Sequence, residues 1–220
     1  IIFVSNINYA NVLSSIFLKI LRNLKLILIE RTPFQELEIF FNLKDFLKKK
    51  IIFYLAKFFY GRADYIVGNS HAVSSYIESK IKQKVLTKYP IIKINNNIKK
   101  KYNKILNISW IGRNTKEKNL DDFIKCINLI NRQNVIINII TNNNSKKKIK
   151  NLISQNLLKK VNFFNFTNNN KILNKIYKMT DIYINTSIYE GFPNTVAEAV
   201  NNECLVISSK SFGGCREIIK

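Results

Sequence analysis

Residues able to hold a metal ion are scarce in this chain, and their scarcity excludes one class of site. The sequence contains a single His, His71, and three cysteines, and Cys126, Cys204 and Cys215 lack the spacing of metal ligands. We therefore predict that the chain binds no metal. An odd, sparse set of cysteines also argues against a disulfide framework and indicates a reducing compartment, so we expect a cytoplasmic location.

Long hydrophobic runs are lacking as well. No apolar run reaches the roughly 18–20 residues that a membrane span requires, and the run over residues 51–60 is shorter and holds Lys57. No signal peptide is visible. The chain opens at Ile1 inside an apolar run and closes at Lys220 inside a predicted helix. We therefore interpret it as a fragment that lacks the N-terminal start and the C-terminal end of a longer protein.

Acidic residues are few: 14 Asp and Glu stand against 36 Lys and Arg, which gives a formal net charge of +22. Such a charge is typical of proteins that bind nucleic acid or an anionic membrane. A bias toward Ile, Asn and Lys along the whole length explains the charge without any partner, and we favour that explanation. Arg supplies only six of the cationic residues, whereas base-specific DNA recognition favours Arg. We predict no specific nucleic-acid partner.

One segment of the sequence has features of a membrane-contacting helix. Between Phe40 and Tyr60 the chain combines five lysines with several aromatic residues. Basic, aromatic-rich helices can lie in a membrane interface. The alternative is an ordinary helix that covers a sheet. Peripheral contact with an anionic membrane, at the inner face of the plasma membrane, is therefore a hypothesis.

What the sequence does contain is a regular alternation of short β-rich runs with helical runs. Predicted strands cover residues 1–5, 26–30, 65–68, 84–88, 105–111, 135–141, 161–166, 181–186 and 204–208, and helical stretches include 120–130, 146–158 and 170–178. Many of the strands are almost wholly apolar, as expected for parallel sheets covered on both faces. The alternation predicts an α/β fold with parallel sheets.

A polar segment divides this pattern in two. Residues 91–103 are rich in Asn and Lys and are followed by a fresh strand. We predict a linker there, between a partial N-terminal α/β domain over residues 1–90 and a second α/β domain over residues 104–220.

Glycine is rare, with six in the chain, and four of the six follow predicted strands of the second domain: Gly112, Gly191, Gly213 and Gly214. Ligands of open α/β sheets bind beyond the carboxyl ends of the strands. Two of these turns lead into helices, whose first N–H groups and partial positive charge suit a phosphorylated ligand.

The side chains beside these glycines allow two interpretations each. Arg113 and Lys118 follow Gly112 and either grip a diphosphate or are ordinary surface cations. Glu198 either binds a ligand or closes a capping box with Thr195 at the start of a helix. Glu190 precedes Gly191 at the end of a strand, and no such structural role accounts for it.

These motifs together resemble the signature of retaining family 4 glycosyltransferases, which have the GT-B architecture of two Rossmann-like domains facing across a cleft. The resemblance rests on Glu190-Gly191-Phe192-Pro193-Asn194 through Glu198, and on Gly213-Gly214-Cys215-Arg216-Glu217. Gly112-Arg113 with Lys118 is similar to the Gly-Arg…Lys element of the family. More weakly, the segments 30–33 and 64–70 resemble parts of the N-terminal domain, which here would be incomplete.

The resemblance implies roles for these residues. Glu190 would contact the donor sugar, Glu198 would bind the ribose hydroxyls, and Arg113 and Lys118 would neutralise the departing diphosphate. The implied donor-binding residues are Gly112, Gly191, Phe192, Pro193, Asn194, Thr195, Glu198, Gly213 and Gly214.

The implied activity is transfer of a hexose, with retention of configuration, from a nucleotide sugar to a lipid-linked or polysaccharide acceptor of the cell envelope. The donor is expected to be a UDP-sugar rather than a GDP-sugar, and no cofactor or metal is implied. The alternatives are a catalytically inactive scaffold of the same fold and, less favoured, a basic nucleic-acid-binding protein. The sequence names neither the sugar nor the acceptor.

Overall fold

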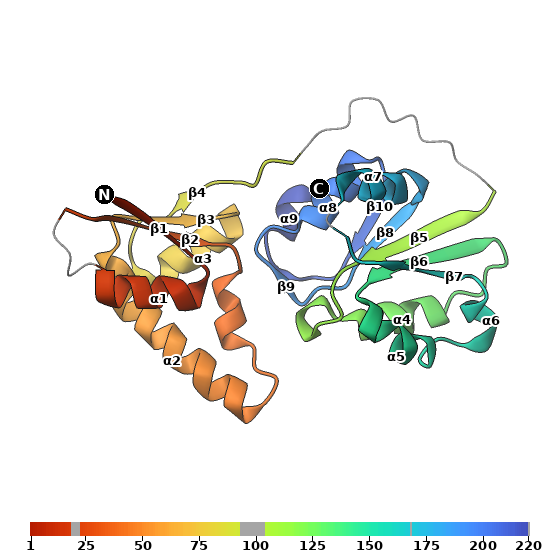
Figure 1. Ribbon diagram of the computed structural model, residues 1–220, viewed down its shortest axis with the longest axis horizontal. Helices are drawn as coiled ribbons and strands as arrows, with labels where there is room; N and C mark the ends of the chain where they lie inside the picture. Colours follow the sequence, from red (N-terminus) through yellow and green to blue (C-terminus); the bar gives the residue numbers. More distant parts are fainter. Residues whose placement is uncertain (19–22, 93–103, 168, 220) are drawn as a thin grey trace.

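The computed structural model describes residues 1–18, 23–92, 104–167 and 169–219 and folds them into two lobes, each built on a parallel sheet (Figure 1). The first lobe comprises residues up to 92 and the second those from 104 on. The predicted α/β fold with parallel sheets is thereby confirmed.

The sheet of the first lobe has the strand order β1-β2-β3-β4 and is parallel throughout. Its elements are β1 (Ile2–Asn6), α1 (Asn8–Phe17), β2 (Lys25–Glu30), η2 (Phe34–Glu38), α2 (Leu43–Phe59), η3 (Tyr60–Arg62), β3 (Tyr65–Gly68), α3 (His71–Ile81) and β4 (Leu86–Thr87). A single buried cluster joins β2 and β3 to the helices, with Leu28, Phe34, Ile66 and Ile77 among its members. By contrast, Ile2 and Val4 of β1 are more than half exposed.

The sheet of the second lobe has the order β10-β8-β5-β6-β7 and is also parallel. Its elements are β5 (Leu106–Ile111), η4 (Lys116–Lys118), α4 (Leu120–Asn128), β6 (Val135–Thr141), η5 (Asn143–Ser145), α5 (Lys146–Lys150), α6 (Gln155–Leu158), β7 (Val161–Asn165), α7 (Asn170–Met179), β8 (Ile182–Asn185), β9 (Tyr189–Glu190), α8 (Asn194–Asn201), β10 (Leu205–Ser208), β11 (Phe212–Gly213) and α9 (Cys215–Ile218).

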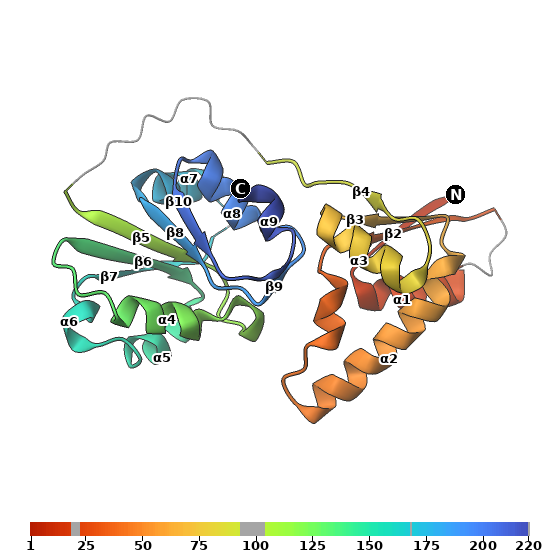
Figure 2. The ribbon, with the colours of Figure 1, turned by 180° about the vertical axis from the view of Figure 1, so that it is seen from behind.

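Helices cover both faces of this second sheet. Helices α4, α5 and α6 lie on one side and α7 and α8 on the other (Figures 1 and 2). One apolar cluster packs α4 and α5 against β5 and β6, and another packs α7 and α8 against the opposite side of the sheet. Burial on both faces explains why the strands of this lobe read as continuous apolar runs in the sequence.

One predicted element is wrong. The helix expected over residues 146–158 is two short helices, α5 and α6. The side chain of Asn128, at the end of α4, donates to Leu152 O at 3.0 Å and accepts from Ser154 N at 3.1 Å. These bonds satisfy backbone groups that a continuous helix would have paired internally, so the break depends on a residue distant in sequence. The predicted linker falls mainly on residues 93–103, which lie outside the described residues, and the predicted domain limits stay a prediction.

The two lobes touch where the carboxyl ends of their strands meet. The carboxylate of Glu217, in α9, accepts from the backbone N–H of His71 at 3.0 Å and of Ala72 at 2.7 Å, at the start of α3. It also accepts from Tyr89 Oη at 2.7 Å. Glu217 thus supplies a helix cap across the interface.

Candidate functional site

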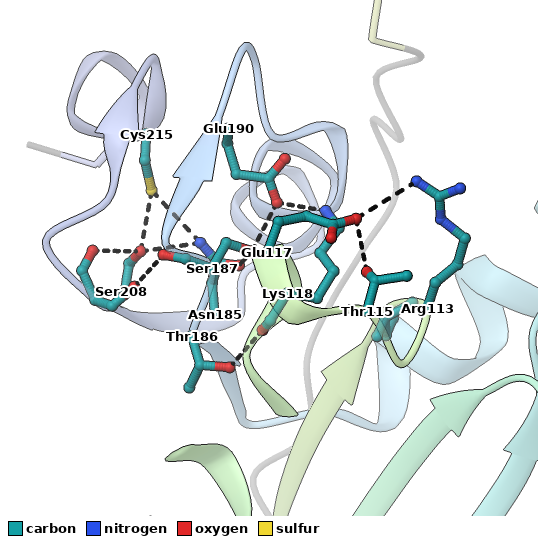
Figure 3. A network of polar contacts seen from close by, with 12 residues as sticks. Arg113, Thr115, Glu117, Lys118, Asn185, Thr186, Ser187, Glu190, Ser208 and Cys215 are labelled. Atoms are coloured by element: carbon teal, nitrogen blue, oxygen red, sulfur yellow. Dashed lines mark hydrogen bonds and ion pairs between the residues drawn. The ribbon is translucent and has the colours of Figure 1, made fainter. Parts of the chain in front are cut away.

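Two loops of the second lobe are fixed side by side at the carboxyl ends of its strands. One follows β5 and runs through Arg113 to Lys118, and the other links β8 to β9. The indole of Trp110 donates to Thr186 Oγ1 at 3.0 Å, and Thr186 Oγ1 donates to Lys118 O at 3.0 Å. Ile188 N donates to Glu117 O at 2.8 Å. Figure 3 shows the side chains that these loops bring together.

The central contact is an ion pair between Lys118 and Glu190, which are 72 positions apart in the sequence. Lys118 Nζ donates to Glu190 Oε1, and the side chains are 21% and 13% exposed, respectively. Ser187 Oγ lies 2.7 Å from the same carboxylate oxygen. A charge-assisted network of this kind fixes the position of both charges, while some surface of each stays open to a ligand.

Arg113 does not join this pair. Its guanidinium lies 3.9 Å from Glu117 Oε1, and its side chain is 61% exposed. Thr115 Oγ1 donates to that same Glu117 oxygen at 2.6 Å. The structure therefore places Arg113 at the rim of the loop, where solvent screens its charge.

The glycines of the site are explained by close backbone approaches. Gly213 has φ +106°, and a Cβ on it would lie 1.7 Å from Glu190 O. A Cβ on Gly191 would lie 1.8 Å from Arg31 O of the first lobe. Gly214 N donates to Gly191 O at 3.0 Å, so the glycine pair packs β11 against the end of β9. Gly112 also has little space for a side chain, since a Cβ there would lie 3.0 Å from the Trp110 ring.

Glu198 bonds to a side chain rather than to the start of its own helix. Its Oε2 accepts from Tyr177 Oη at 2.9 Å. Helix α8 starts after Pro193 with no side-chain cap, so the capping-box interpretation of Glu198 is wrong. Burial raises the pKa of the Glu198 carboxyl, and the Tyr177 hydrogen bond partly offsets this. Among the described residues, the hydrogen bond from Tyr177 engages Oε2 of this carboxylate and not Oε1.

Glu198 also lines a pocket of about 220 Å³ together with Asn194, Asn202 and Ile92. The first N–H groups of α8, from Asn194 and Thr195, belong to the donors that lack partners within a helix. Phe192, just before them, lies with its ring centroid 5.8 Å from that of Tyr89. The segment 192–198 therefore holds the first amide groups of a helix without a side-chain cap, and its Asn194 and Glu198 line the same pocket.

A larger pocket of about 500 Å³ lies next to the first loop and is lined by Phe41, Thr115, Lys116 and Ile149, among others. It contains none of Lys118, Glu190 and Glu198. Size alone favours this larger pocket, but Glu198 and Asn194, the first residue of α8, line the smaller one. Lys118 and Glu190 line neither pocket. We place the candidate site at the smaller pocket and the ion pair because these supply groups that bind hydroxyls and phosphate.

Sequence reasoning missed three residues that organise the site: Ser187, Tyr177 and Glu217. Ser187 and Tyr177 hold the two predicted glutamates, and Glu217 joins the lobes. Only Glu217 belonged to a quoted motif, and the backbone amides that donate to it lie about 145 positions away. Among the described residues, no three His, Cys, Asp or Glu side chains gather in a way that could hold a metal ion; metal independence stays a prediction.

The family profile described as "Glycosyl transferases group 1" matches residues 89–220. The chain belongs to this family. It is 30% identical to the uncharacterized glycosyltransferase MJ1059 of Methanocaldococcus jannaschii, and the match covers 94% of this chain and 53% of that protein. The chain thus spans about half the length of this curated relative.

Solved structures agree on the fold. The sucrose-phosphate synthase of Thermosynechococcus elongatus matches with a TM-score of 0.78 and 14% identity, over 98% of this chain and 57% of its own. Anabaena HepE in complex with UDP-glucose matches with a TM-score of 0.69 and 16% identity, over 100% of this chain and 62% of its own. The fold is that of GT-B glycosyltransferases, over part of their length.

Proposed function

We propose that this family member transfers a hexose from a nucleotide-sugar donor, with retention of configuration, to a lipid-linked or glycan acceptor of the cell envelope. The observation that carries the proposal is the Lys118–Glu190 pair at the end of β9. The next helix along the chain is α8, which begins at Asn194 and carries Glu198 at the smaller pocket. The UDP-glucose complex of HepE, which has the same fold, supports UDP as the donor nucleotide.

Each group has a task in this reaction. The Glu198 carboxylate oxygen that Tyr177 leaves open accepts from ribose hydroxyls. The α8 amides and Lys118 meet the diphosphate, whose charge grows as the bond to the sugar breaks. Glu190 contacts the sugar at the reacting centre. Donors already fixed in place stabilise that charge without reorganising at the moment of reaction, and no metal ion is required.

Release of UDP or GDP from a panel of nucleotide sugars by the full-length protein, with and without chelator, tests the proposal. We expect turnover of at least one UDP-sugar that survives chelation. Glu190→Gln should abolish most of it, while Glu78→Gln, the same change on an exposed part of α3, should leave it intact. Absence of turnover with every donor and a range of glycan acceptors, in folded protein, would overturn the assignment.

A further inference from the structure

Helix α2 is apolar on two opposite sides, and among the residues that the structure describes only one of these sides packs against the rest of the protein. The buried side carries Ala56 and packs Ile52, Phe53 and Leu55 against the core of the first lobe. The opposite side carries a stripe that we call the α2 stripe: Leu43, Leu47, Ile51, Tyr54 and Phe58, each between 55% and 75% exposed. At about 100° per residue, these five side chains fall within an arc of about 80° on the helix.

Lysines border the α2 stripe on both sides. By the same helical geometry, Lys44 and Lys48 flank one edge and Lys50 and Lys57 the other. Lys48 Nζ lies 4.5 Å from the centroid of the Tyr9 ring, and Lys50 Nζ lies 5.6 Å from that of Phe40. The borders therefore combine cations with aromatic rings, while acidic residues are absent from the stripe and its borders.

This arrangement distinguishes between possible occupants. Lysine is depleted in protein–protein interfaces, so two lysine borders are unfavourable around a docking site for a second protein. An anionic lipid surface fits, because apolar side chains enter the acyl boundary while lysine stems extend to the headgroups. The chain's charge of +22 adds long-range attraction to such a surface. No helix among the described residues is long and apolar enough to cross a membrane.

We infer that α2 docks the protein in the plane of an anionic lipid membrane, through the α2 stripe and its lysine borders. The inference is independent of the proposed donor chemistry. It refines the membrane hypothesis for residues 40–60 to one face of one helix. The expected mode is peripheral and salt-sensitive, since both apolar burial and charge contribute.

Sedimentation of the full-length protein with phosphatidylcholine vesicles, with and without phosphatidylglycerol, tests the inference at low and high sodium chloride. We expect binding only to the anionic vesicles, weakened by salt. Ile51→Glu should lower the partition coefficient by ~10-fold or more, because one buried aliphatic side chain is lost and a like charge is added. Leu129→Glu is the matched control, since Leu129 is 85% exposed in the second lobe; it should change partitioning by less than about twofold.

A second pair of variants distinguishes binding through α2 from nonspecific attraction caused by the net positive charge. Replacing Lys44, Lys48 and Lys57 together by Gln should weaken binding by at least ~10-fold at low salt. The equal charge change at Lys147, Lys159 and Lys178, exposed in the second lobe, should matter much less. Equal loss in both triple variants, no binding at low salt, or self-association through Ile51 without vesicle binding would each overturn the inference.

Discussion

Each lobe ends a strand with a glutamate, and the two glutamates have opposite surroundings. Glu30, the last residue of β2, is fully buried, and its Oε1 accepts from Tyr60 Oη and from Asn11 Nδ2 at 2.8 Å. Both of these donors are neutral. Glu190, the last residue of β9, is paired with the ammonium of Lys118 and keeps 13% of its side chain exposed.

The difference separates a structural carboxyl from one available for chemistry. Burial among neutral donors raises the pKa of Glu30 to about 7, although the hydrogen bonds from Tyr60 and Asn11 oppose this. Glu30 therefore serves the packing between β2, α1 and η3. A carboxylate that a neighbouring cation holds in place, and that is partly exposed, can stabilise charge that develops on a bound substrate. The proposed function assigns chemistry to the second glutamate alone.

The largest effect is expected when this comparison is tested on activity. Glu190→Ala in the full-length protein should lower kcat/KM for sugar transfer by at least ~100-fold, about 2.7 kcal/mol of transition-state stabilisation. Glu30→Gln, which keeps the shape of the buried acid, should stay within a few-fold of wild type. Steady-state kinetics on both variants is the check, and near-normal turnover by Glu190→Ala would remove Glu190 from the mechanism.

Stability should depend on pH through Glu30. Its native pKa of about 7 lies above the ordinary 4.5, so the native state binds more protons within that window and stability falls as pH rises through it. Gln at position 30 cannot ionise, so Glu30→Gln should lose about 2 kcal/mol less unfolding free energy than the wild type as pH rises. This is smaller than the full pKa difference would give, because the interior relaxes around the ionised carboxylate. Urea unfolding of both proteins between pH 4.5 and 8 measures it; parallel pH profiles would contradict the assignment.

A smaller effect concerns the junction between the lobes. Glu217→Ala removes the acceptor from His71 N and Ala72 N, at a cost of about 1 kcal/mol, the usual value of a helix cap. Amide hydrogen exchange should therefore speed up at Ala72. The backbone N–H of Val73 donates to Ser70 Oγ at 3.2 Å, and this bond does not involve Glu217. Exchange at Val73 therefore provides an internal control. Unchanged exchange at Ala72 would show that Glu217 does not cap α3 in solution.

The smallest effect is expected at Arg113. Because its side chain is 61% exposed, Arg113→Ala should weaken UDP binding by less than ~1 kcal/mol, about fivefold at most. Arg132→Ala, the same change at an exposed position of the second lobe, should have no effect. Calorimetry on the two variants makes the comparison. A loss of two orders of magnitude for Arg113→Ala would mean that its side chain becomes buried against the nucleotide.

The second lobe was easier to predict from sequence than the contacts that complete its site. Strands such as β6 were predicted to the residue because apolar runs buried on both faces carry a strong local signal. The break between α5 and α6 was missed because it depends on Asn128 of α4. The short strands β9 and β11 pair residues from separate loops, so no local pattern announces them.

The site shows the same division. Glycine turns and their charged neighbours identified Glu190, Glu198 and Lys118 as candidates. That Lys118 would pair with Glu190, and that Tyr177 would hold Glu198, are facts of tertiary structure. Glu198 also fitted a local capping motif, and only the fold showed that it bonds elsewhere.

The central claim is that the nucleotide binds at the charged site of the second lobe and does not depend on the buried carboxyl of the first. Isothermal titration of the protein with UDP, in the presence of a chelator, tests this most directly. We expect measurable binding by the wild type and by Glu30→Gln, and a loss of affinity of at least ~10-fold in Lys118→Ala, the scale of one charged hydrogen bond. No heat of binding from folded wild-type protein, or equal affinity in Lys118→Ala, would contradict it.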